Sequence, residues 1–123
     1  MATTLTRESL LGKCERRIDR VEVDGFGEVL IRSPDELTRS RRVSGLFDEN
    51  GSQNQRNLSL RRVHDIIDHV MADESTPMFT ERDCDAIASL DSYKLDALVM
   101  AIQAFKDVDE KKEQVESSDT SES

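Results

Sequence analysis

The sequence predicts a small α+β domain: an N-terminal antiparallel β-hairpin packed with four or five α-helices, followed by a disordered acidic C-terminal tail. Three observations lead to this prediction. Two short runs with an apolar residue at every second position flank a glycine-bearing turn, which is typical of a hairpin. Several later segments repeat their apolar residues at helical spacing. The chain ends in a stretch that is almost entirely polar.

The length of 123 residues favours one domain, which we expect to span residues 1–107, with the tail at residues 108–123. From Lys106 to Ser123 there are seven acids and three lysines. Such a composition buries too little apolar surface to offset chain entropy. The net charge of −9 makes the chain a poor partner for DNA or anionic membranes. The sequence also lacks the run of roughly 20 apolar residues that spans a bilayer, and its first residues lack the long apolar stretch of a secretory signal.

The N-terminal part is expected to form a short helix and then the hairpin. Thr6 can cap a helix from about Arg7 to Lys13. The turn sequence "DGFG" joins the two strands, and its glycines supply the positive φ that such a turn requires. One face of the strands carries four apolar residues: Val21, Val23, Val29 and Ile31. Phe26, between two glycines, is expected to fold over the hairpin or to dock on a helix.

A second helix is expected to begin at the sequence "SPDE". Ser33 would be its N-cap, Pro34 would take the first helical position, and Glu36 would complete a capping box. This helix is expected to run to about Gly45 and to carry three arginines: Arg39, Arg41 and Arg42.

Three further helices are expected in the second half of the chain. A polar loop over residues 47–57 precedes an amphipathic helix from about Leu58 to Ala72. Thr80 opens the next helix through the capping-box-like sequence "TERD". The last helix is expected from about Ser92 to Asp107, and its apolar stripe consists of Leu95, Leu98, Val99, Ile102 and Phe105.

The sequence "HDIIDH" is the most metal-like string in the chain. His64 with Asp68, and Asp65 with His69, form two i, i+4 pairs, but the two histidines do not share a helix face. A zinc site would need at least one more ligand, and the sequence shows no partner motif. We interpret the string as two solvated pairs on a helix surface. No metal or other cofactor is expected.

Enzymatic chemistry has little support in the sequence. Cys14 and Cys84 are isolated, as expected of reduced thiols. Acids flank Cys84, so nothing nearby lowers the pKa of its thiol, and burial on a helix is its expected role. The "DGFG" turn lacks the strand–loop–helix pattern of a phosphate loop. We expect that the protein is not an enzyme.

Two basic clusters, Arg39–Arg42 and Arg61–Arg62, leave three interpretations open. They can form a solvated helix face, a docking surface for an acidic protein, or a contact with nucleic acid. Neither cluster alternates with aromatic residues, as nucleic-acid contacts often do. A small nucleic-acid-binding regulator that uses these helices is therefore the alternative function.

The order of segments resembles that of the tail assembly chaperones of long-tailed bacteriophages and prophages. Members characteristically have a short N-terminal helix, a "VEV…WGG-V-hydrophobic-R" hairpin, a helix, and a "D-x-x-G-x-x-x-F-T-x-x-D" segment before a final helix. The hairpin signature is matched by Val21, Val23, Phe26, Gly27, Val29, Ile31 and Arg32, and the second by Phe79, Thr80, Asp83 and Leu90. The likeness covers about residues 4–105. Phe26 replaces the usual Trp, one glycine of its pair is missing, and the glycine before Phe79 is replaced within "DESTPMF".

The resemblance implies a non-enzymatic protein of the host bacterial cytoplasm. It implies binding to the tape measure protein and recruitment of tail tube subunits during tail morphogenesis, without nucleic-acid or membrane partners. Some members also have a longer product made by frameshifting. We expect the exposed surfaces around the hairpin turn and on the arginine helix to contact these partners. The candidate residues are Phe26, Arg32, Arg39 and Arg42.

Overall fold

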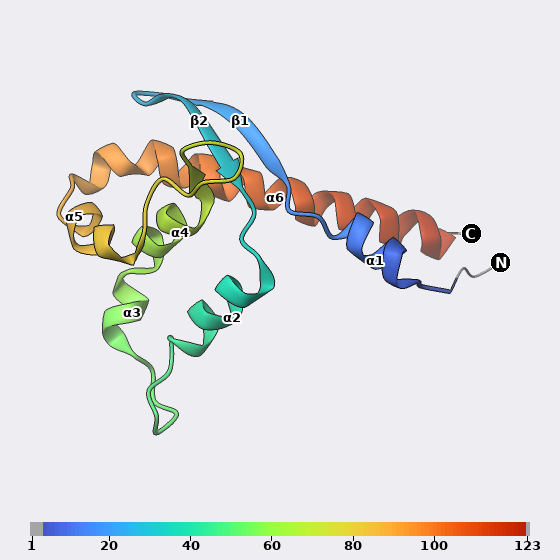
Figure 1. The fold of residues 1–123 in the computed structure, drawn as a ribbon, viewed down its shortest axis with the longest axis horizontal. Coiled ribbons are helices and arrows are strands. Elements are labelled where there is room, and N and C mark those ends of the chain that lie inside the picture. The colour runs from blue at the N-terminus through green and yellow to red at the C-terminus, as the bar shows by residue number, and fades with distance from the viewer. Residues whose placement is uncertain (1–3, 123) are drawn as a thin grey trace.

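The computed structural model describes the backbone of residues 4–122 and the side chains of residues 4–108. It confirms the α+β class, with a three-stranded antiparallel sheet and helices around it (Figure 1). In chain order the elements are α1 (Arg7–Lys13), β1 (Ile18–Val23), β2 (Gly27–Arg32), α2 (Glu36–Ser44), α3 (Gln55–Ser59), α4 (Arg61–His69), β3 (Val70–Met71), the 3₁₀ helix η1 (Glu81–Asp83), α5 (Cys84–Ala88) and α6 (Ser92–Glu122).

The predicted hairpin is confirmed. β1 and β2 pair antiparallel, with Ile18 opposite Arg32 at one end and Val23 opposite Gly27 at the other. The backbone N–H of Phe26 donates to the carbonyl oxygen of Val23 at 2.9 Å, which closes the turn. Gly25 within this turn has φ +84°, a conformation that glycine adopts without the steric cost of a Cβ.

The core lies between the hairpin and helices α4, α5 and α6. Ile31 of β2, Ile66 of α4 and Ile102 of α6 are its most fully buried large side chains. The expected stripe of the last helix faces this core, because Leu98, Ile102 and Phe105 are buried: they contact residues such as Val23, Val63 and Ile87 in one cluster. Figure 1 shows the hairpin crossing over α6, with α4 on the same side of the sheet as α5.

The start of the second helix differs from the prediction. The N-cap is Asp35, whose carboxylate accepts a hydrogen bond from the backbone N–H of Thr38 at 2.8 Å. The Ser33 hydroxyl instead accepts from the backbone N–H of Arg17 at 2.9 Å. The prediction of Ser33 as the cap was wrong because a long-range hydrogen bond to the residue before β1 takes its hydroxyl.

The single helix expected over residues 58–72 is also wrong. Asn54 caps the short helix α3, its side chain accepting from the backbone N–H of Asn57 at 3.0 Å. α4 follows after Leu60 and ends at His69. Val70 and Met71 are extended, because they pair with β2 opposite Ile31 and Leu30. Pairing with the sheet and burial of both residues outweigh their helical periodicity.

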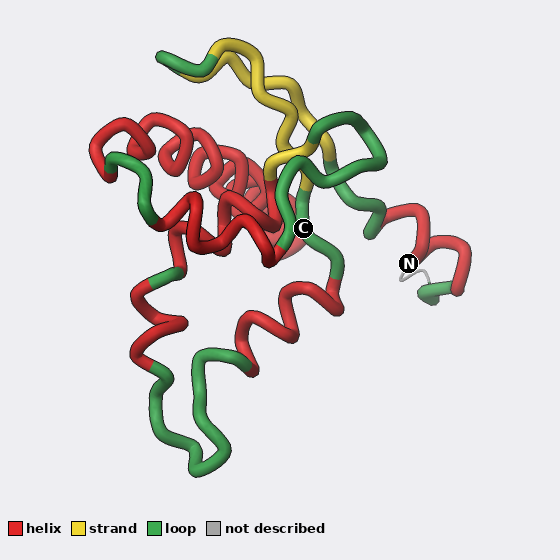
Figure 2. The backbone as a smooth tube through the Cα atoms, turned by 60° about the vertical axis from the view of Figure 1, so that its left-hand side comes forward, coloured by secondary structure: helices red, strands yellow, loops and turns green. Residues whose placement is uncertain are grey.

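Residues 36–59, here called the arm, project from the rest of the molecule. The arm consists of α2, the connecting loop and α3, and Figures 1 and 2 both show it extending away from α6. Neither α2 nor α3 contains a buried residue. The arm is therefore attached by polar contacts rather than by a shared apolar core.

Two predictions concern the chain end and membranes. α6 is assigned to Glu122, but the side chains of residues 109–123 lie outside those described. The disordered acidic tail at residues 108–123, and the division from a domain at 1–107, therefore stay predictions.

In the described part of the chain, none of the helices has the length and apolar character needed to cross a membrane.

Candidate functional site: an apolar groove beside the hairpin

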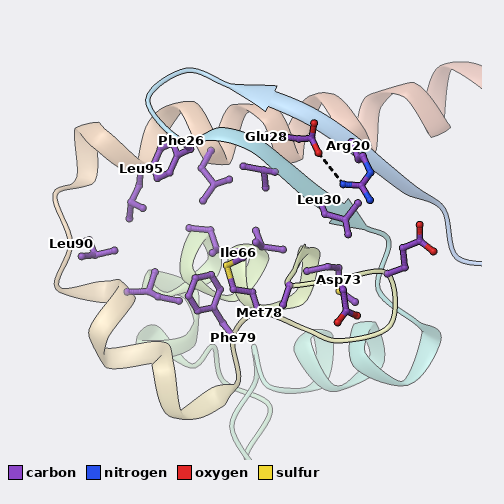
Figure 3. A pocket seen from close by; sticks show the side chains of 17 residues that line it. Arg20, Phe26, Glu28, Leu30, Ile66, Asp73, Met78, Phe79, Leu90 and Leu95 are labelled. Atoms are coloured by element: carbon purple, nitrogen blue, oxygen red, sulfur yellow. Dashed lines mark hydrogen bonds and ion pairs between the residues drawn. The ribbon is translucent and has the colours of Figure 1, made fainter.

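An apolar groove with a volume of about 460 Å³ lies beside the hairpin. The hairpin forms one wall, and α4, α5 and the start of α6 form the other (Figure 3). Its lining includes Phe26, Val29, Ile66, Met71, Phe79 and Leu90. This volume falls within the range of pockets that bind ligands in proteins, roughly 300–1,000 Å³.

Local structure on both sides positions these side chains. The hairpin turn presents Phe26 at one end of the groove, where 45% of the residue stays exposed. On the other side, Thr80 and Asp83 form the predicted capping box. The Asp83 carboxylate accepts from the backbone N–H of Thr80 at 2.8 Å, and the Thr80 hydroxyl accepts from the N–H of Arg82. This box starts η1 at Glu81, two residues after Phe79, and so fixes the segment that brings Phe79 to the groove.

Charged groups lie on the rim. Arg20 and Glu28, on neighbouring strands, form an ion pair at 2.9 Å. Beyond them, the turn after β3 carries Asp73 and Glu74. Hydrogen bonds, first from the backbone N–H of Ser75, lower the pKa of Asp73. An exposed carboxylate is ionised near neutral pH without such a shift. The rim therefore has a surplus of negative charge.

The groove joins two segments that are distant in sequence. Phe26 and Val29 belong to the hairpin signature, whereas Phe79 and Leu90 belong to the segment before the last helix. Sequence reasoning identified both segments but gave no sign that they meet. It also missed Met78, which is 50% exposed at the groove and lies one residue before Phe79.

The four residues predicted to contact partners do not form one surface. Phe26 lines the groove. The Arg32 guanidinium donates to the backbone carbonyl of Glu74 at 3.1 Å and so supports the acidic turn of the rim. Arg39 is exposed on the arm. Arg42 points toward α4 and is engaged within the chain.

Arg42 anchors the arm to α4. Its Nε donates to one carboxylate oxygen of Asp68 at 2.9 Å and its Nη2 to the other at 2.8 Å. Nη2 also contacts Glu81. The hydrogen bonds to Asp68 are the main cause of the raised pKa of Arg42. Such a bidentate pair is a strong, directional contact, so Arg42 has a structural role.

The second basic cluster is also partly paired. Arg62 of this cluster forms an ion pair with Asp96 of α6. Outside the clusters, Arg56 of α3 faces Asp85 of α5 at 3.4 Å. Each basic cluster thus contains an arginine bound to an acid of the same chain, which reduces the positive charge available to a polyanion.

The interpretation of "HDIIDH" as two solvated pairs is wrong for both pairs. Asp68 binds Arg42, and its side chain is only 9% exposed. His69 is only 4% exposed, its Nδ1 lies 2.8 Å from the backbone oxygen of Asp65, and its ring meets Phe105 edge to face. Asp65 pairs with Lys106 at 3.1 Å instead. His69 lies three residues after the buried Ile66 and therefore on the same helix face, a spacing that could have indicated its burial. Burial lowers the pKa of His69 and favours its neutral form.

Among the described residues there is neither a group arranged to hold a metal ion nor a disulfide. No group of three or more His, Cys, Asp or Glu side chains there is arranged to hold a metal ion. Cys84 is half-buried and Cys14 is exposed, and neither forms a disulfide.

Comparisons with known proteins found no relative of this chain. The chain matches no model of a protein family, no curated protein sequence and no solved structure.

Proposed function

We propose that the protein is a phage or prophage tail assembly chaperone. It binds the tape measure protein and recruits tail tube subunits during tail morphogenesis, in the cytoplasm of the bacterial host. The role is non-enzymatic and uses no cofactor.

One observation carries this proposal: the two segments that resemble the chaperone family converge on one groove. Phe26 and Val29 come from the first segment, and Phe79 and Leu90 from the second. A resemblance spread over unrelated surfaces would point to shared folding alone. Residues that form a common apolar hollow are instead suited to a common binding function.

The character of the groove favours a protein partner. Phe26, Met78 and Leu90 are each about half exposed beside the hollow. Exposed apolar side chains grouped around a concave surface are typical of protein-binding sites. The Arg20–Glu28 pair and the acidic turn at the rim provide the polar border that such sites usually have.

The alternative, a regulator that binds nucleic acid through its arginine helices, has less support. The chain has a net charge of −9. Arg42 and Arg62 are bound to Asp68 and Asp96. Nucleic-acid binding depends on an accumulation of available positive charge.

The experiment is co-expression with the tape measure protein encoded in the same genome, followed by affinity capture of the complex. We expect the unmodified chain to capture it. Leu90→Asp, which places a charge at the groove, should abolish capture. Met100→Asp is the matched control: Met100 is 70% exposed on α6 and does not line the groove, so capture should persist.

The outcomes separate the two functions. A folded chain that fails to capture the tape measure protein, and binds no tail tube subunit, contradicts the proposal. A tight, sequence-selective complex with duplex DNA at physiological salt would favour the regulator. Genes for a tail tube protein upstream and a tape measure protein downstream are also expected next to this gene.

A further inference from the structure

The groove lies along an incomplete edge of the sheet. β1 pairs with the whole of β2, but on the other side of β2 the short strand β3 pairs only with Leu30 and Ile31. Among the described residues, the stretch Gly27–Val29 therefore has a neighbouring strand on one side only. Phe26, Glu28 and Val29 of this region line the groove.

The register shows which backbone groups face the open edge. The N–H of Ser33 donates to the carbonyl of Arg17, which continues the ladder between β1 and β2. In an antiparallel ladder, alternate residues direct both backbone groups toward the same neighbour. The backbone N–H and C=O groups of Ile31 and Val29 thus point toward β1. Those of Leu30 and Glu28 point away from it.

A second hydrogen bond supports this assignment. Leu30 points its backbone groups away from β1, and its partner on β3 is Met71. Met71 therefore points its N–H and C=O toward β2, and those of the preceding residue, Val70, point away from β2. The N–H of Met78 indeed donates to the carbonyl of Val70, on the side away from β2. Glu28 is therefore the residue of β2 whose N–H and C=O meet the groove beyond the end of β3.

Acidic side chains outnumber basic ones around this edge, where the cations are Arg20, Arg32 and Lys94. Asp73 and Glu74 lie at the β3 end of the groove and form no ion pair among the described residues. Toward the hairpin tip, an adjoining hollow is bordered by Asp24 and Asp91, together with one cation, Lys94. An apolar segment with basic residues at its ends would match both the lining and the rim.

We propose that the groove binds an extended apolar segment of the tape measure protein, flanked by Lys or Arg, which adds as a strand beside Gly27–Val29 in line with β3. Its backbone bonds to Glu28, and its apolar side chains fill the groove. One basic end faces Asp73 and Glu74, and the other faces Asp24 and Asp91 near the hairpin tip. This mode of binding is strand addition at an exposed sheet edge. The inference rests on the proposed function for the identity of the partner.

The first test uses synthetic peptides and the full chain. The probe is a fluorescent peptide of about eight residues, a typical strand length, that alternates Val with Thr and has lysines at both ends. Two further series of the peptide carry methyl groups on backbone nitrogens, one at every odd residue and the other at every even residue. Only one of these series removes the N–H groups that face β2, so we expect one to bind at least about tenfold more weakly and the other to bind like the parent.

The second test concerns charge. The lysine-flanked peptide should bind more tightly than a version with Glu in place of Lys, and added salt should reduce the difference. The double variant Asp73→Asn, Glu74→Gln should lose most of this preference, while its new amide keeps an oxygen that can accept from the backbone N–H of Ser75. Asp48→Asn, Glu49→Gln is the matched control, because both acids are exposed at the tip of the arm.

Failure of this inference is distinguishable from failure of the proposed function. If the chain captures the tape measure protein but the peptide does not bind, or both N-methylated series bind equally, strand addition is overturned and the chaperone role stands. If the peptides discriminate but the tape measure protein is not captured, the edge site stands and the chaperone role fails. Self-association of the chain that Leu90→Asp abolishes would assign the groove to a second copy and overturn the inference.

Discussion

The arm and the rest of the molecule are held in place by different interactions. In the rest, Ile31, Ile66 and Ile102 are almost completely removed from solvent. In the arm, α2 and α3 bury no residue. Arg42 ties α2 to Asp68 on α4, and the Asn57 side chain donates to the carbonyl of Gly45, which joins the two helices of the arm.

The difference shows how one short chain divides its limited apolar content. Four Phe, one Tyr and no Trp are available, so Leu, Ile and Val must supply most of the core. The buried ones are concentrated in α4, α6 and the sheet, where burial of apolar surface is a non-directional driving force. The arm depends on a few directional hydrogen bonds, so losing one of them is expected to release it without unfolding the rest.

The largest expected effect is in the core. Ile102→Ala removes a side chain that is 1% exposed and leaves a cavity, so the free energy of unfolding should fall by about 2–5 kcal/mol. Urea denaturation measures it. Met100→Ala is the control on the same helix, since Met100 is 70% exposed and its loss should cost little. Equal costs for the two variants would contradict the placement of the core.

The next effect concerns the attachment of the arm. Arg42→Met leaves the carboxylate of Asp68, whose side chain is 9% exposed, without its bidentate partner. We expect a loss of about 1.5–3 kcal/mol, typical of a hydrogen bond to a charged group. Hydrogen exchange should show protection lost in α2 and retained in α4 and α6.

Arg39→Met is the control for that experiment, because Arg39 is exposed and the substitution should change stability by no more than about 0.5 kcal/mol. If Arg42→Met reduced protection equally in α2, α4 and α6, the arm and the core would be a single cooperative unit. The comparison between them would then fail.

His69 is expected to make core stability depend on pH. Burial lowers its folded-state pKa below the unfolded value of 6.5, so the unfolded chain binds a proton first as pH falls. The contribution of neutral His69 is complete above pH 6.5 and is lost as pH falls toward the folded-state pKa. His69→Leu, measured by thermal unfolding between about pH 7.5 and 5.5, should show a smaller loss of stability than the parent.

The control for this titration is His64→Gln. Burial, and next the charge of Arg42, lower the pKa of His64 in the same direction, so this variant should remove only its own part of the pH dependence. Identical pH profiles for His69→Leu and the parent would show that the buried imidazole does not control acid stability.

The smallest effect is expected at the rim of the groove. The side chains of Arg20 and Glu28 are each about 60% exposed, whereas those of Arg42 and Asp68 are 26% and 9% exposed. The N–O distances of the two pairs are nevertheless similar, at 2.9 and 2.8 Å. Solvent screens an exposed pair, so Arg20→Gln should cost about 0.2–1 kcal/mol by chemical denaturation. A cost as large as that of Arg42→Met would mean that directional contacts matter equally in the hairpin and in the arm.

Elements whose signals are local could be predicted from the amino-acid sequence alone. The turn between β1 and β2 needs a residue with positive φ, and Gly25 supplies it within a few residues. The capping box of Thr80 and Asp83 joins residues three apart. The stripe of Leu98, Ile102 and Phe105 recurs along one helix and requires one buried face. In each case, the interacting groups are close together in the chain.

Features that depend on residues distant in the chain are set by long-range contacts and could not be predicted from local signals. Val70 and Met71 have helical spacing, but pairing with β2 makes them a strand. The Ser33 hydroxyl has the chemistry of a cap, but the backbone of Arg17 takes it. The groove forms because the fold brings Phe79 beside the hairpin, about fifty residues away along the chain. Local propensities amount to tenths of a kcal/mol to about 1 kcal/mol per residue, so burial and long-range hydrogen bonds of similar or larger size override them.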